Sequence, residues 1–307
     1  MRKNKLVVIL GPTASGKTDL SIKLAKKYNG EVVSADSRQI YRGMDIGTAK
    51  PKINHKGKKI LSGGIVHWLL DIRNPDKPYT VAEYKKEAVR IIRQILKRNK
   101  LPILAGGTGL YIQAVTENLN IPEVKADNAL RAKIEKEIQK HGLDFVFKKL
   151  IKLDPEAAYI VDPKNPRRVI RALEITLLTK KPFSQQRKVG SPLFDVLEIG
   201  VSVPEKKLRE RINQRTEKMI KSKLVEEVKK LIKKYGANQQ SFDAIGYREI
   251  IEYLNNKITL EQATETIKIN TWHYAKRQIT WFKRDKRIHR VKNFKEAVKL
   301  LNKFIYV

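Results

Sequence analysis

A phosphate-binding pattern near the N-terminus constrains this chain more than any other feature. Residues 11–18 read Gly-Pro-Thr-Ala-Ser-Gly-Lys-Thr and match G-x-x-x-x-G-K-[ST] at every fixed position. An apolar run, residues 6–10, precedes the pattern, and a run with helical periodicity, residues 19–28, follows it. A strand, a glycine-rich turn and a helix in this order form the context in which such a loop binds phosphate. The sequence therefore predicts a phosphate chain as ligand, but the loop alone does not say which molecule carries it.

The residue types of the loop suit this chemistry. Gly11 and Gly16 allow a tight turn that aims backbone N–H groups inward, and the N-terminus of the next helix adds positive potential. Lys17 supplies a cation for phosphate oxygens, and the Thr18 hydroxyl is a candidate ligand of Mg²⁺. The predicted phosphate-binding residues are Gly11, Pro12, Thr13, Ala14, Ser15, Gly16, Lys17 and Thr18.

Composition excludes several classes of protein. Cysteine is absent, which excludes disulfide bonds, thiol catalysis and cysteine-ligated zinc. No apolar run approaches the ~20 residues that a membrane-spanning helix needs. The first residues lead directly into the first apolar run and leave no room for a signal peptide, so we expect a cytoplasmic protein without membrane contact.

The charge is strongly basic and unevenly distributed. The 307 residues include 65 Lys and Arg against 32 Asp and Glu, a formal net charge of +33. Residues 1–118 carry 23 basic and 9 acidic side chains and residues 201–307 carry 26 and 12, whereas residues 119–200 carry only 16 and 11. A uniformly lysine-rich composition would not leave the middle so much nearer neutral. A polyanion larger than one phosphate chain, first of all a nucleic acid, is therefore the expected partner.

Strand-like and helix-like runs alternate in both terminal parts of the chain. The strand-like runs are residues 6–10, 31–35, 66–71, 101–105 and 196–203, with a final edge strand at 287–291. This alternation predicts an α/β fold in which helices cover a parallel sheet on both faces. From residue 127 to about residue 178 the pattern is helical, so we expect a helical insertion domain at 119–195, between core segments 1–118 and 196–307.

The helical patterns give further expectations. Capping boxes at Thr80 and Thr259 predict helices that run to about residues 98 and 284. A single long helix is expected over residues 204–235, and a basic, polar loop over residues 50–59.

Polar side chains follow two predicted strands at the edge of the sheet where ligands bind. Asp36 comes directly after residues 31–35, where it suits a general base, a ligand of Mg²⁺ through water, or the cap of the next turn. Thr108 lies in the glycine-rich turn after residues 101–105 and suits a ligand contact or a helix cap. No Asp or Glu ends that strand, as it would in an ATP hydrolase, which disfavours an ATP-driven motor.

Several arginines are candidate anion contacts. Arg211 and Arg215 lie four residues apart in a predicted helix and can converge on one anion. Arg167, Arg168 and Arg171 cluster in the insertion, as a solvated helix face or as phosphate contacts.

The last predicted helix interleaves basic and aromatic side chains. Arg277 and Arg284 share one face of it and are candidate nucleic-acid contacts. Trp272, Trp281 and Phe282 are interpreted mainly as core residues.

Six segments together resemble the tRNA dimethylallyltransferase (tRNA isopentenyltransferase) family. They are residues 11–18, 36–51 (Asp-Ser-Arg-Gln-Ile-Tyr-Arg-Gly-Met-Asp-Ile-Gly-Thr-Ala-Lys-Pro), 67–72 before Pro75, 106–111, 245–248 and 275–281. The resemblance spans residues 5 to about 291, and its most specific segment is 36–51. The absence of cysteine and the early end suggest the shorter, bacterial type, without an appended zinc finger.

The resemblance implies transfer of a dimethylallyl group from dimethylallyl diphosphate to N6 of adenosine 37 in tRNA. The loop would hold the diphosphate, with Mg²⁺ on Thr18. Asp36 would be the base, and Thr108 and Arg215 would assist catalysis. The adenine of adenosine 37 would be flipped into a channel through the core. A monomer is expected. The tRNA contacts implied by the family's segments are Asp36, Ser37, Arg38, Gln39, Arg131, Arg167, Arg168, Arg171, Gly246, Tyr247, Arg248, Arg277, Gln278 and Arg284.

Three other functions compete with this hypothesis. An adenylate isopentenyltransferase would modify a free nucleotide, but the basic C-terminal third and the insertion favour tRNA. A small-molecule kinase with a phosphate loop would turn over ATP and would not need the positive charge. A non-catalytic nucleic-acid-binding protein would not need to keep Lys17, Thr18 and Asp36 intact.

Overall fold

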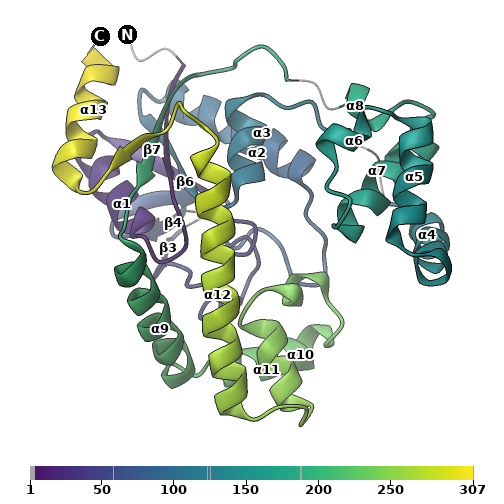
Figure 1. The fold of residues 1–307 in the computed structure, drawn as a ribbon. Helices are drawn as coiled ribbons and strands as arrows, with labels where there is room; N and C mark the ends of the chain where they lie inside the picture. The colour runs from purple at the N-terminus through teal and green to yellow at the C-terminus, as the bar shows by residue number, and fades with distance from the viewer. Residues whose placement is uncertain (1–3, 58, 123, 125, 187–188, 307) are drawn as a thin grey trace. The chain divides into compact units, whose positions relative to one another are not determined.

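The chain forms two compact units. They are Met1–Thr116 together with Leu193–Val307, and Glu117–Pro192. The insertion was expected at 119–195. The computed structural model (Figure 1) describes residues 4–57, 59–122, 124, 126–186 and 189–306. In this part of the chain, no helix is both long and apolar enough to cross a membrane.

The first unit is built on a mixed sheet of eight strands in the described chain, in the order β3-β4-β5-β2-β6-β1-β7-β8. Neighbours from β5 to β8 pair in parallel, and β3, β4 and β5 pair antiparallel. The strands are β1 (Lys5–Leu10), β2 (Gly30–Ala35), β3 (Asn54–Lys56), β4 (Lys59–Ser62), β5 (Ile65–Trp68), β6 (Leu101–Gly106), β7 (Asp195–Val201) and β8 (His289–Val291). The predicted edge strand is therefore confirmed as β8, next to β7.

Helices cover both faces of this sheet (Figure 1). The helices of the unit are α1 (Lys17–Lys27), α2 (Val81–Lys97), α3 (Gly109–Thr116), α9 (Glu205–Lys221), α10 (Leu224–Tyr235), α11 (Tyr247–Leu254), α12 (Leu260–Lys283) and α13 (Phe294–Tyr306), with a 3₁₀ turn, η1 (Gln240–Asp243). Alternate side chains of β1 point to opposite faces, as a strand requires. Leu6, Val8 and Leu10 pack with α2 and α3, whereas Val7 and Ile9 pack with α1 and α13.

The segment after β2 joins a second core formed by α9, α10, α11 and α12. Ile40 and Met44 are fully buried there, against Val228 of α10 and Tyr247 and Ile250 of α11. This packing fixes the chain that follows Asp36, and the site described below depends on it.

The second unit is a helical domain with its own core. Its helices are α4 (Asn128–His141), α5 (Leu143–Leu153), α6 (Ala157–Ile160), α7 (Pro166–Thr179) and α8 (Phe183–Gln186). Ile134, Val146, Leu150 and Leu173 are buried together. Asp127 begins α4 by accepting the N–H of Leu130.

Several expectations from the sequence are wrong in detail. The helix expected over 204–235 is two helices, because Lys223 adopts a left-handed backbone (φ 71°) between α9 and α10. The expected basic loop 50–59 contains β3 and the start of β4. The third predicted strand ends at Trp68, since the residue after it, Leu69, also has positive φ (61°). The capping boxes at Thr80 and Thr259 are confirmed.

Candidate active site at the phosphate-binding loop

The loop between β1 and α1 has the backbone of a phosphate cradle. Gly16 has φ 96°, in the region that favours glycine, and directly precedes the first residue of α1, Lys17. The N–H of Ser15 donates to the carbonyl of Pro12 (3.3 Å), which closes the turn. The first N–H groups of α1 therefore open toward the loop, where an anion would meet the positive end of the helix.

Two polar side chains of the loop, those of Ser15 and Lys17, indicate a site for a bound anion. The Ser15 hydroxyl is buried (3% exposed) and has no hydrogen-bond partner among the described residues. Lys17 Nζ donates to the Pro12 carbonyl at 2.6 Å. Burial lowers the pKa of Lys17 to about 8, while Asp36 raises it and Arg215 lowers it further. A buried, unpaired hydroxyl beside a desolvated ammonium fits a site for anionic oxygens.

Helix α9 supplies two arginines to the same loop. Arg215 Nη2 donates to Thr13 Oγ1 (2.7 Å), and Arg211 Nη1 donates to the Ser15 carbonyl (3.4 Å). Burial lowers the pKa of Arg215, and the charge of Asp36 opposes this shift. Arg211 and Arg215 lie about one turn of α9 apart, and Leu208 and Ile212, on the same side of this helix, pack it against α12 beside the loop.

Asp36 lies beside the cationic side chains of Lys17 and Arg215. Its Oδ1 atom accepts the backbone N–H groups of Arg38 (2.9 Å) and Gln39 (3.3 Å), so this oxygen caps the turn after β2. The same carboxylate raises the pKa of both Lys17 and Arg215. The turn-capping and the chemical interpretations of Asp36 therefore do not exclude each other, because one oxygen fixes the carboxylate next to the phosphate loop.

Thr108 ties the turn after β6 to the turn after β2. Its Oγ1 accepts the N–H of Ser37 (3.0 Å), and its own N–H donates to the Ala35 carbonyl (3.1 Å). It also hydrogen-bonds Tyr274 of α12. Thr108 thus stands at the meeting point of two strand ends and one helix.

Helix α12 contributes two residues whose roles the sequence did not indicate. Gln278 is 6% exposed; its Oε1 accepts the N–H of Thr13 (2.8 Å), and its Nε2 donates to the Gly107 carbonyl (2.8 Å). Gln278 was predicted to contact tRNA; in this structure its amide joins the two glycine-rich loops. Burial raises the pKa of Tyr274 to about 12, and the charge of Asp36 adds to the shift. The signals in the sequence were the four-residue spacing of Tyr274 and Gln278 on one helical face and, for Gln278, its place in the segment 275–281.

Other predicted tRNA contacts in the first unit divide by exposure. Tyr247 is fully buried and Gly246 is also buried, so neither residue has much surface that a large ligand could contact. Arg248, Arg277 and Arg284 are exposed. Arg277 also lies over the ring of Tyr274, 5.8 Å from its centroid.

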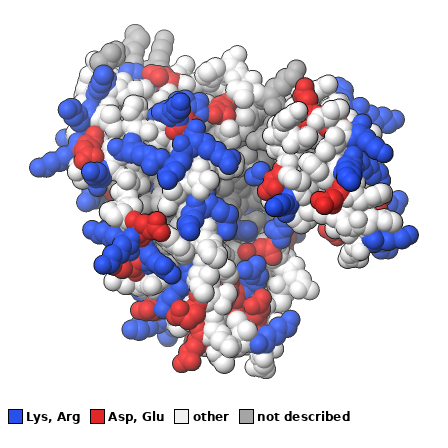
Figure 2. Space-filling view, viewed as in Figure 1, with Lys and Arg blue, Asp and Glu red and all other residues white. Residues whose placement is uncertain are grey.

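In the second unit, the predicted contacts again fall into two groups. Arg131 and Arg171 pair with Glu174, which has no exposed side-chain surface, at 2.9 and 2.5 Å. Arg167 and Arg168 are exposed. Lys and Arg side chains cover much of the face shown in Figure 2.

The donors near the loop fit a hydrated Mg²⁺ that is shared with a phosphate ligand. Among the described residues, no group of three His, Cys, Asp or Glu side chains could hold a metal by itself. Thr18 in the first turn of α1 and Asp36 offer one hydroxyl and one carboxylate. Mg²⁺ commonly takes such a small set and completes its shell with water and phosphate oxygens.

The comparisons with known proteins agree with this geometry. A family model described as IPP transferase matches residues 39–285, and one described as isopentenyl transferase matches residues 4–60. A tRNA dimethylallyltransferase of Caldanaerobacter subterraneus subsp. tengcongensis is 46% identical over 288 residues, covering 91% of this chain and 89% of that protein. A tRNA dimethylallyltransferase of Halalkalibacterium halodurans is 44% identical over 285 residues, covering 92% of this chain and 88% of that protein.

Solved structures give the same result. The full-length tRNA isopentenylpyrophosphate transferase of Bacillus halodurans superposes with a TM-score of 0.71 at 39% identity, covering 99% of this chain and 96% of that one. A eukaryotic dimethylallyltransferase acting on tRNA gives a TM-score of 0.77 at 28% identity, covering 99% and 80%. The chain therefore belongs to the IPP transferase family, together with the bacterial tRNA dimethylallyltransferases.

Proposed function

We propose that this protein transfers a dimethylallyl group from dimethylallyl diphosphate to N6 of adenosine 37 in tRNA, giving N6-isopentenyladenosine. The observation that carries the proposal is the position of Asp36. A carboxylate suited to accept a proton lies beside the phosphate loop and interacts with both Lys17 and Arg215. The names of the relatives support the choice of donor and acceptor.

The loop and α9 stabilise the leaving group. As the bond between the allylic carbon and the diphosphate oxygen breaks, negative charge grows on the diphosphate. The N–H groups at the start of α1, Lys17 and Arg215 meet that charge in fixed positions, so they stabilise it without having to reorganise during the reaction. Mg²⁺ held by Thr18, and through water by Asp36, would neutralise further charge on the diphosphate.

Asp36 acts on the nucleophile. The exocyclic amine of adenine is a weak nucleophile, and its attack on the allylic carbon leaves a proton to be removed. The carboxylate of Asp36 takes that proton, and the N–H groups of Arg38 and Gln39 hold the carboxylate in place. Thr108, bonded to Ser37 and Tyr274, orients the turn that carries the carboxylate.

The acceptor is large and polyanionic. An adenine in an anticodon loop must leave the stack to reach a group at the carboxyl ends of the strands. The exposed Arg248, Arg277 and Arg284, with Arg167 and Arg168 of the insertion, are the proposed contacts to tRNA phosphates. The paired Arg131 and Arg171, and the buried Gly246, Tyr247 and Gln278, would act indirectly by fixing these surfaces.

All the groups assigned to this reaction come from one chain, so we propose that a monomer suffices. The cytoplasm, where tRNA is matured and used, is the proposed location.

Incubation with labelled dimethylallyl diphosphate and Mg²⁺ tests the proposal, with unmodified tRNA bearing adenosine 37 or with AMP as acceptor. Label in tRNA, lost in Asp36→Asn, is the expected result. Label in AMP alone would make the protein an adenylate isopentenyltransferase. ATP turnover without label transfer would make it a kinase.

A further inference from the structure

A glutamate of α10 fills a nest of backbone N–H groups in the loop 36–50. The Oε2 atom of Glu227 accepts the N–H groups of Asp45 (3.1 Å) and Ile46 (2.8 Å). Its Oε1 atom accepts the N–H of Gly47 (3.2 Å). Three consecutive N–H groups that converge on one carboxylate are an anion site satisfied within the protein.

Helix α11 closes the same contact from its first residue. The hydroxyl of Tyr247 donates to Glu227 Oε1 at 2.6 Å, and the tyrosine is fully buried. A Cβ atom at Gly47 would lie 2.4 Å from Cε2 of the Tyr247 ring, so the loop backbone packs directly on the ring. α10 and α11 therefore grip the loop through one carboxylate and one phenol.

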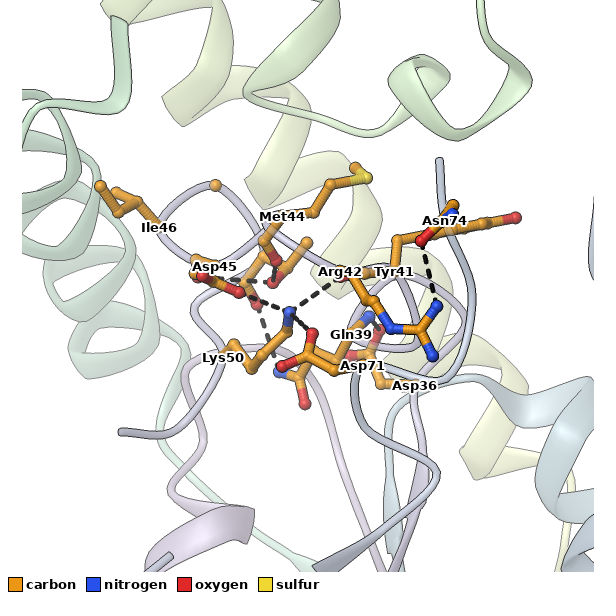
Figure 3. A network of polar contacts seen from close by, with 12 residues as sticks. Asp36, Gln39, Tyr41, Arg42, Met44, Asp45, Ile46, Lys50, Asp71 and Asn74 are labelled. Atoms are coloured by element: carbon orange, nitrogen blue, oxygen red, sulfur yellow. Dashed lines mark hydrogen bonds and ion pairs between the residues drawn. The ribbon is translucent and has the colours of Figure 1, made fainter. Parts of the chain in front are cut away.

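The loop itself is a closed unit. The ammonium of Lys50, with a side chain 1% exposed, points toward Asp45 (2.5 Å) and Asp71 (Figure 3). The ammonium also donates to the Tyr41 carbonyl (2.8 Å), and the N–H of Lys50 donates to the Asp45 carbonyl (2.9 Å). Because these bonds link its parts, we expect the loop to shift as one body when any part of it is displaced.

Gln39 connects the loop to Asp36. Its Nε2 atom donates to the carbonyls of Thr48 (3.2 Å) and Ala49 (3.4 Å). Its backbone N–H is one of the two that hold Asp36 Oδ1. The position of residues 45–49 therefore sets the position of one hydrogen bond to the carboxylate.

We propose that Glu227 is a positioning residue for prenyl transfer, which fixes Asp36 through the loop 36–50 and couples it to α10 and α11. This inference rests on the proposed function. Arg248 in the first turn of α11 is a proposed tRNA contact. The same helix would therefore couple tRNA binding to the position of the Asp36 carboxylate.

Glu227→Gln is the sharpest perturbation because it keeps the shape of the side chain. The amide NH₂ must replace one of the two carboxylate oxygens, and each oxygen accepts at least one backbone N–H. Two donors then face each other whichever way the amide turns, and the loop must shift. Misplacement of a catalytic group by ~1 Å can cost ~10²-fold in rate.

The measurement is the single-turnover rate of prenyl transfer to tRNA, expressed per diphosphate-binding site so that unfolded protein is not counted. Glu227→Gln should lower this rate about 10- to 100-fold and leave the affinities for tRNA and dimethylallyl diphosphate within about twofold. Glu226→Gln, an equal change of charge at the exposed neighbouring position, should match the wild type. Leu301→Ala, which truncates a fully buried side chain of α13 in a core cluster that the loop 36–50 does not join, should lower the melting temperature without changing the rate per site.

The outcomes separate the two proposals. If the wild type labels no tRNA, the proposed function fails whatever the variants do. If the wild type is active and Glu227→Gln keeps its rate per site, the role of Glu227 is overturned. Should Glu227→Gln not fold, Glu227→Asp replaces it. Its carboxylate is set back by one methylene and should slow the reaction, and an undiminished rate there would equally refute the inference.

Discussion

The affinity for dimethylallyl diphosphate should fall steeply with pH because of Lys17. Burial lowers the pKa of this side chain to about 8, so the ammonium loses its proton within a readily accessible range. Roughly 90% of the side chains carry the proton at pH 7 and roughly 10% at pH 9. If only the ammonium form binds the diphosphate, the association constant falls about tenfold between these values, which corresponds to about 1.4 kcal/mol.

Calorimetric titration of the free enzyme with dimethylallyl diphosphate, without tRNA, isolates this effect. The terminal phosphate of the ligand is already largely ionised above pH ~7, so its own titration contributes little. Tyr274 titrates far higher, since burial raises its pKa to about 12. The sign is therefore determined by Lys17, with tighter binding at low pH and weaker binding at high pH.

Lys17→Arg provides the control, because the guanidinium stays charged throughout this range. Its affinity is expected to be lower than that of the wild type but flat between pH 7 and pH 9. A wild-type affinity that is flat over this range would refute the reasoning. So would a Lys17→Arg variant that shows the same decline.

Other groups give further predictions. Asp36→Asn should lower the transfer rate at least ~10²-fold and leave tRNA affinity, measured by filter binding, within about twofold; a large loss of affinity would instead make Asp36 a binding residue. Gln278→Leu leaves the N–H of Thr13 and the carbonyl of Gly107 unpaired, which should destabilise the protein by about 2–5 kcal/mol in urea unfolding; unchanged stability would mean that the amide does not join the loops. With about five phosphate contacts, tRNA affinity should fall about 10²-fold between 50 and 200 mM salt, and a weak salt dependence would remove the argument from charge.

The sequence predicted the parallel core because local patterns determine it. The phosphate loop, its strand and its helix are contiguous, and the alternation of apolar strands with amphipathic helices leaves few other folds. The capping boxes at Thr80 and Thr259 were reliable for the same reason, since each needs only four neighbouring residues.

Other features of the fold were missed because their signal is weak or not local. The break between α9 and α10 falls on Lys223, and lysine is not a residue type that predicts a left-handed backbone. Helix α13 is the exception, because the four-residue spacing of its buried Ala297, Leu301 and Ile305 is a local pattern typical of a helix.

The site shows the same division. The loop residues and Asp36 follow strands directly, so their convergence could be predicted from the topology. The roles of Gln278 and Glu227 could not, because each bonds a segment about 180 or more residues away in the chain. Only the packing of α12 and α10 shows which loop each side chain meets.

The place of β1 in the sheet has a consequence for biosynthesis. This strand is made first, yet its two neighbours are β6 and β7, and β7 ends at Val201. At ~5–20 residues per second, a ribosome needs ~10–40 s to pass from the end of β1 to the end of β7. During that interval an apolar strand has at least one open edge, and open edges recruit chaperones or other nascent chains. Slow translation between residues 10 and 201 should therefore lower the yield of folded enzyme more than slow translation after residue 201.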